Sequence, residues 1–116
     1  MPRSEVQPSD ATESGVQVVL VTAPEDAAGA LARALVGERL AACVNIVPAV
    51  RSVYRWEGRL EEDTEVLLVA KTNIERVAEL SERVRELHPY ELPETLALPV
   101  SGGSPAYLGW VNAETT

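Results

Sequence analysis

Apolar and polar residues alternate along this chain in blocks that predict four strands and three helices. The first block, Val16–Thr22, is a mostly apolar run rich in β-branched residues, which is typical of a strand buried on both faces. Asp26 follows as the N-cap of a predicted helix over Ala27–Arg39. Leu31 and Leu35 lie on one side of that helix, so we expect this side to cover the sheet.

The next two blocks predict a long β-hairpin. Ala42–Glu57 has strand character but is interrupted at Pro48. Because proline has no N–H for the hydrogen-bond ladder, Pro48 marks a bend or a bulge. Gly58 lies in the turn region, and Leu60–Thr72 returns as an antiparallel strand whose inner part, Val66–Ala70, is wholly apolar.

A second helix is predicted over Asn73–Leu87. Thr72, followed three residues later by Glu75, has the spacing of a capping box. Within the helix, Glu79 and Arg83 are four residues apart in the favourable orientation for an ion pair.

The last predicted elements are a strand over Thr95–Val100 and a short terminal helix. Ser104 is suited to the N-cap of that helix and Pro105 to its first position. The element order is therefore βαββαβ with a helical tail. This order predicts an α+β, ferredoxin-like sandwich in which both long helices lie on one face of an antiparallel sheet.

The predicted hairpin arms are longer than a small four-stranded sheet can cover. Their outer part carries Val53, Tyr54 and Trp56, which would leave apolar side chains and unpaired backbone groups exposed. Association with further copies of the chain removes both problems, so we expect an oligomer.

Composition and charge narrow the classes of partner. The chain has 116 residues and a formal net charge of −8, which argues against a nucleic-acid surface or an anionic membrane as partner. Met1–Gly15 is polar and reads as a flexible tail without the features of a signal peptide, which leaves residues 16–116 as one domain. Cys43 is the only cysteine, so a reducing, cytoplasmic location is expected.

The segment Leu87–Glu94 holds the only histidine, His88, close to two prolines and two carboxylates. The prolines restrict the backbone of this turn. His88, Glu91 and Glu94 together make a plausible donor set for a divalent metal ion. The alternative is a rigid connection between helix and strand.

Two other groups of residues are weaker candidates for chemistry. Three roles are open to Cys43: a core residue, a soft metal ligand or a nucleophile. Core packing is favoured because free cysteines are usually buried. No nucleophile elbow or phosphate loop is present, so we do not expect an enzyme.

The acidic residues near the hairpin tip lack a calcium-loop pattern and read as a solvated segment. They are Glu61, Glu62, Asp63 and Glu65.

The few aromatic residues are concentrated in the hairpin, the proline turn and the terminal helix. This distribution favours packing between subunits, with a ligand cleft bordered by the same residues as the alternative. They are Tyr54, Trp56, Tyr90, Tyr107 and Trp110.

Five ordered blocks of sequence resemble the CutA family of divalent-cation tolerance proteins. The blocks are VVLVTAPED at Val18–Asp26, LAACVNIVP at Leu40–Pro48, SVYRWEGRLEEDTEVLLVAKT at Ser52–Thr72, HPYELPE at His88–Glu94 and PAYLGWVNA at Pro105–Ala113. Together they cover almost all of the chain from Val18 to Ala113.

The resemblance implies the ferredoxin-like fold, a homotrimer and a role in divalent-cation tolerance. It also implies binding of copper, zinc or similar ions near His88, together with a thiol in some members. Val21 stands at the position of that thiol here, so weaker and less copper-selective binding is expected. Two alternatives remain: a regulatory module resembling the P-II proteins, with a small effector in clefts between subunits, and a scaffold for other proteins.

Overall fold

The computed structural model describes residues 14–116. In chain order the elements are β1 (Val16–Ala23), α2 (Glu25–Gly37), β2 (Cys43–Trp56), β3 (Arg59–Asn73), the 3-10 turn η1 (Ile74–Arg76), α3 (Val77–Leu87), β4 (Leu96–Pro99) and α4 (Pro105–Glu114). Of the predicted tail, only Ser14 and Gly15 fall within the described residues. The carbonyl of Gly15 accepts a hydrogen bond of 2.7 Å from the Ile74 N–H, beside the start of β1.

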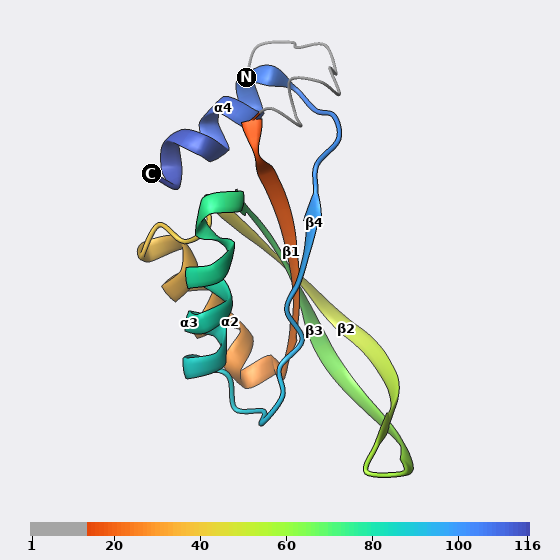
Figure 1. Cartoon of the computed structure of the whole chain (residues 1–116). Helices are drawn as coiled ribbons and strands as arrows, with labels where there is room; N and C mark the ends of the chain where they lie inside the picture. Colours follow the sequence, from red (N-terminus) through yellow and green to blue (C-terminus); the bar gives the residue numbers. More distant parts are fainter. Residues whose placement is uncertain (1–13) are drawn as a thin grey trace.

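The four strands form one antiparallel sheet in the order β2-β3-β1-β4. Helices α2 and α3 lie together on one face of this sheet, and the opposite face carries no helix along most of its length (Figure 1). This arrangement confirms the predicted ferredoxin-like α+β sandwich. The helix-free side is called the open face below.

The main core fills the space between the two long helices and the sheet. Apolar side chains on alternate strand positions meet the apolar sides of the helices, and each fully buried one contributes about 1.5–3 kcal/mol. The largest of them are Val19, Val21, Leu35, Leu68, Leu80 and Val84. A second, smaller cluster lies under α4 and contains Val16, Ala42, Leu108 and Val111.

Helix α2 begins earlier than predicted and is not capped by Asp26. Pro24 occupies the N-cap position with φ −63° and ψ 150° and makes no side-chain cap bond. Its carbonyl accepts hydrogen bonds from the N–H groups of Ala27 and Ala28, each 3.0 Å long. Asp26 lies in the first turn instead, where a carboxylate interacts favourably with the helix dipole.

The predicted capping box at the second helix is also wrong. The Thr72 side chain is fully buried and donates a 2.6 Å hydrogen bond to the Leu40 carbonyl. The cap is Asn73, whose Oδ1 accepts from the Glu75 N–H at 2.9 Å. Thr72 therefore joins β3 to the connection after α2 instead of starting a helix.

The predicted ion pair within α3 does not form. Arg83 is paired with Glu38 after α2 at 2.9 Å, and Glu79 is paired with Arg76 at 3.2 Å. Arg83 thus links the two long helices, because Glu38 is the C-cap residue of α2.

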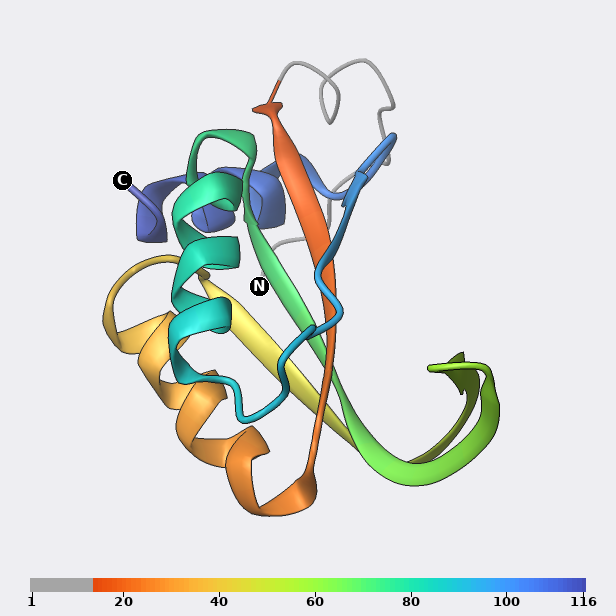
Figure 2. The same cartoon turned by 60° about the horizontal axis from the view of Figure 1, so that its bottom comes forward.

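The β2–β3 hairpin extends well beyond the body of the molecule and curves (Figures 1 and 2). At its tip, Glu57 and Gly58 have φ values of 49° and 78°, which suits a two-residue turn. The pairing shifts register between Val47 and Val50, and Ala49 there has φ 62°. This confirms the irregularity expected at Pro48.

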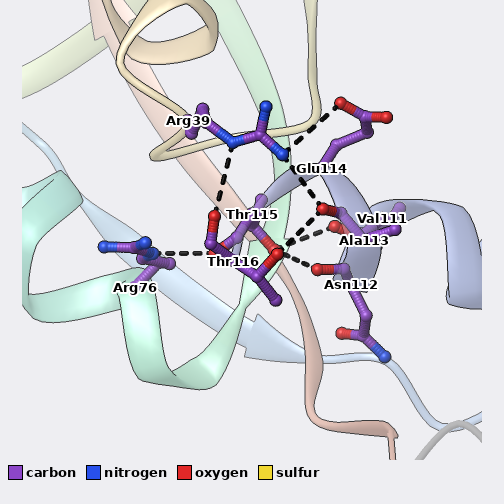
Figure 3. Close-up of polar contacts among 8 residues, drawn as sticks. All are labelled: Arg39, Arg76, Val111, Asn112, Ala113, Glu114, Thr115 and Thr116. Carbon is purple, nitrogen blue, oxygen red and sulfur yellow. Dashed lines mark hydrogen bonds and ion pairs between the residues drawn. The ribbon is translucent and has the colours of Figure 1, made fainter.

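Helix α4 is held at both ends. Its N-cap Ser104 accepts a 3.3 Å hydrogen bond from the Tyr107 N–H, as predicted. At its C-terminal end, Arg76 donates to the Thr115 carbonyl at 2.7 Å, and Arg39 donates to the Ala113 carbonyl at 3.1 Å (Figure 3). The two guanidinium groups satisfy carbonyls that a helix end leaves unpaired.

Within residues 14–116, the helices are all too short or too polar to cross a lipid bilayer.

Replacing Thr72 by valine should lower the free energy of unfolding by about 1–3 kcal/mol, because the Leu40 carbonyl then loses a buried donor. Urea denaturation measures the change. Thr64→Val is the control, since Thr64 lies on the same strand but is exposed. Equal effects of both substitutions would contradict a specific role for the Thr72 hydroxyl.

Candidate functional site

A pocket of about 930 Å³ lies between the curved hairpin and the turn that follows α3. Alternate residues of a strand point to the same side, so the hairpin presents aromatic residues from β2 beside acidic residues from β3. The turn adds further side chains of both kinds. The residues on which the site depends are Tyr54, Trp56, Asp63, Glu65, Tyr90 and Glu94.

Glu65 is the most unusual residue of this pocket. Only 5% of its surface is exposed, and the Tyr90 side chain is hydrogen bonded to its carboxylate. One of its oxygens, Oε2, is buried and has no hydrogen-bond partner within residues 14–116. A buried carboxylate oxygen without a donor is costly, so Glu65 has the capacity to accept a donor or a cation from outside the chain.

Glu94 adds a second carboxylate close enough to interact with Glu65. Partial burial and the charge of Glu65 both raise the pKa of Glu94. Because the negative charge of Glu65 disfavours the charged form of Glu94, a cation placed near both would lower the energy of the pair.

Two tyrosines donate hydrogen bonds to acidic residues of the pocket. Burial, followed by the hydrogen bond to Glu65, raises the pKa of Tyr90 to about 12. The hydrogen bond from Tyr54 to Asp63 is the main cause that raises the pKa of Tyr54 to about 12. Both phenols therefore stay protonated at neutral pH and hold their carboxylate partners in place.

His88 is buried, with 6% of its surface exposed, and both of its ring nitrogens are occupied. The Tyr90 N–H donates to Nδ1 at 3.0 Å, so the ring proton is on Nε2, which donates to the Thr22 carbonyl at 2.7 Å. Neither nitrogen keeps a lone pair for a metal ion in this arrangement. His88 instead fixes the turn against β1 and positions Tyr90.

The predicted metal ligands His88, Glu91 and Glu94 do not come together as one donor group. Across residues 14–116, no three or more His, Cys, Asp or Glu side chains are placed to hold a metal ion together. Glu91 and Glu94 line the pocket, while the imidazole of His88 is directed to backbone groups. The rigid-connection alternative describes His88 better.

The structure also corrects the interpretation of Glu65. The sequence predicts that it is solvated together with its acidic neighbours, yet it is buried, because it immediately precedes the apolar run Val66–Ala70 and lies beside the turn that follows α3. One feature of the sequence pointed to a shared site: Glu65 is two residues from Asp63, so both side chains lie on one face of β3.

Cys43 is half-buried instead of belonging to the core. It pairs in register with Lys71 and lies close to Tyr107, whose pKa is raised first by burial and then by the neighbouring Cys43. Tyr107 lies beside Trp110 with ring centroids 5.5 Å apart and the rings tilted by 41° to each other. Tyr107 and Trp110 lie on α4. Of the predicted aromatic residues, only Tyr54, Trp56 and Tyr90 line the pocket.

The fold and the pocket define a ferredoxin-like α+β protein with an acidic, tyrosine-lined site beside a protruding hairpin. The chain belongs to the family of the CutA1 divalent ion tolerance protein, whose family profile matches residues 17–114.

Individual relatives agree with this assignment. The chain is 52% identical to the divalent-cation tolerance protein CutA of Thermus thermophilus over 100 residues, which cover 85% of this chain and 97% of that protein. It is 49% identical to the protein CutA of Mus musculus, covering 94% of this chain and 65% of the mouse protein.

Solved structures agree as well. The Thermus thermophilus divalent cation tolerance protein superimposes with a TM-score of 0.85 at 51% identity, covering 87% of this chain and 99% of that one. The PII-like protein CutA from Nostoc sp. PCC 7120 does so with a TM-score of 0.81 at 36% identity, covering 86% and 97%. The family resemblance expected from the sequence is confirmed.

His88→Ala should destabilise the fold by about 1–3 kcal/mol, because the Thr22 carbonyl and the Tyr90 N–H, which form part-buried hydrogen bonds to the imidazole, both lose their partners. Urea denaturation followed by circular dichroism measures this. Glu86→Ala, an exposed change two residues earlier, is the control. Unchanged stability of His88→Ala would contradict the structural role assigned to the imidazole.

Proposed function

We propose that this protein contributes to divalent-cation tolerance by binding divalent cations at Glu65 in the acidic pocket. Two observations support the proposal. Relatives of the chain are named divalent-cation tolerance proteins, and the buried Glu65 carboxylate has an oxygen without a donor within the described residues. The second observation carries the proposal, because a cation would supply the missing partner.

The donor set favours hard ions. Carboxylate oxygens suit Mg²⁺ and Mn²⁺, which keep several water ligands and need only one or two carboxylates from the protein. Glu65 and Glu94 are two such groups, and their charges already interact. Copper or zinc binding through His88 would first require the imidazole to release a backbone partner.

The proposal includes a homotrimer, which the open face of the sheet supports. By register, Leu96 and Leu98 of β4 share this face with Leu20 and Val18 of β1. Leu96 and Leu98 are 55% and 49% exposed. An apolar sheet face of this kind is a marker of association. Since Glu65 lies on the same face of β3 as Leu67 and Val69, the pocket adjoins the surface that further copies would cover.

A P-II-like effector site is the second candidate for the pocket. Its volume of about 930 Å³ is at the upper end of the range for small-molecule sites, roughly 300–1,000 Å³, and far exceeds what a metal ion needs. The similarity to a protein described as PII-like adds support. Binding, and not catalysis, is the proposed activity in either case.

Calorimetric titration with MnCl₂, ZnCl₂ and CuCl₂ tests the cation site. Glu65→Gln should weaken Mn²⁺ binding by about ten- to a hundredfold, because the anionic ligand is lost while the side-chain shape is kept. Glu86→Gln removes one charge from an exposed position of α3 and should leave binding unchanged. If Glu65→Gln binds like wild type, the assignment to Glu65 fails. If His88→Ala alone abolishes binding in a folded protein, the imidazole is the ligand.

Sedimentation velocity at micromolar concentration tests the homotrimer. Wild type should sediment with about three times the 12.5 kDa mass of one chain. Leu98→Glu should yield smaller species, because a charge replaces an apolar group on the open face. Val36→Glu is the matched control, since Val36 is 41% exposed on α2, away from that face. A monomeric wild type would rule out the trimer.

A further inference from the structure

We propose that the pocket also binds a linear organic polycation, an aliphatic polyamine that lies along β3 with one terminal ammonium at Glu65. This inference rests on the proposed function of the pocket as a cation site and names an organic ligand for it. Four observations support it: the row of acidic residues, the excess of negative charge, the aromatic walls and the buried acceptor.

Acidic residues follow one face of β3 at every second position. Glu61, Asp63 and Glu65 pair across the hairpin with Tyr54, Ser52 and Val50, respectively. Successive side chains on one face of a strand are about 6.5–7 Å apart. This spacing is close to the separation of the two nitrogens in an extended four-carbon diamine, so an extended polyamine can place successive ammonium groups beside successive carboxylates.

The negative charge of the pocket is not balanced within residues 14–116. Among the described residues that line it, Arg51 is the one cation, against the carboxylates of Asp63, Glu65, Glu91 and Glu94. The Arg51 guanidinium is paired with Glu62, which is not among those lining residues. A ligand with several positive charges would complement such a site better than a single ammonium group does.

Aromatic rings line the pocket and can contact the alkyl segments that separate the ammonium groups of a polyamine. Tyr54 and Trp56 from the hairpin and Tyr90 from the turn line the same pocket. The hydroxyl groups of the two tyrosines are already engaged with Asp63 and Glu65, which leaves their rings for contact. Ring faces attract ammonium groups and pack against alkyl chains.

The acceptor at Glu65 distinguishes this pocket from an ordinary acidic surface. Glu65 lines the pocket and is 5% exposed, and its Oε2 has no donor among the described residues. A terminal ammonium group carries three N–H donors. One of these donors supplies the partner that Oε2 lacks. A divalent ion bound at the same carboxylate would be displaced.

Titration calorimetry of the full chain with spermidine in 150 mM NaCl tests the proposal. Glu65→Gln should weaken spermidine binding by about ten- to a hundredfold. Trp56→Ala and Asp63→Asn should weaken it by about threefold or more, whereas Glu86→Gln, at an exposed position of α3, should leave it unchanged. Butylamine, with one charge, should bind much more weakly, and Mn²⁺ should compete with spermidine.

Sedimentation of each variant shows whether its assembly is intact. If Trp56→Ala changes the assembly, Asp63→Asn replaces it as the variant that tests the pocket. Absence of spermidine binding overturns the polyamine proposal, whatever Mn²⁺ does. Spermidine binding that Glu65→Gln, Asp63→Asn and Trp56→Ala all leave unchanged overturns it too, because attraction would then be non-specific. Loss of Mn²⁺ binding alone would reject only the ion site.

Discussion

The arrangement of the candidate site depends on one connected set of hydrogen bonds. The imidazole of His88 joins the Thr22 carbonyl of β1 to the Tyr90 N–H, and the side chain of Tyr90 is in turn hydrogen bonded to the Glu65 carboxylate. The turn after α3 is therefore fixed to β1 through a side chain and to β3 through a phenol. Because His88 and Glu65 are buried, the loss of a single partner leaves other groups of the network unsatisfied.

This network explains why the pocket is acidic and yet ordered. Repulsion between neighbouring carboxylates would favour an open, solvated arrangement if nothing opposed it. Tyr90 and Tyr54 each provide a hydrogen bond to one carboxylate. Folding thus retains negative charge at the edge of an apolar sheet face. The proposed cation site and the proposed association surface therefore adjoin each other on one small domain.

Much of the fold follows from the sequence because period-two and helical patterns are long in this chain. The apolar positions of β1 and β3, the irregularity at Pro48 and the cap at Ser104 are local signals, and the structure bears them out. The cap at Thr72 was mispredicted, because a threonine beside a core can use its hydroxyl for a distant carbonyl. Spacing alone does not reveal that competition.

The site was less predictable than the fold for the same physical reason. A lone histidine in a proline turn has the composition of a metal ligand, and only tertiary contacts show that both ring nitrogens serve backbone groups. Glu65 looked solvated because its acidic neighbours are, although it is covered by a turn some 25 residues later in the chain, around Tyr90. The alternation of Asp63 and Glu65 was visible, but the covering segment was not.

The bulge near Ala49 has a consequence for how this hairpin can evolve. β2 has one residue more than β3 between the pairs Val47–Leu67 and Val50–Glu65. Deleting that residue would restore regular pairing and leave Tyr54 opposite Glu61, so the aromatic and acidic residues would still share one face. The bend and the extra twist that a bulge gives its strand would be lost. Single-residue length changes at this point are thus a route by which such a hairpin could alter its angle to the body of the molecule while its core stays intact.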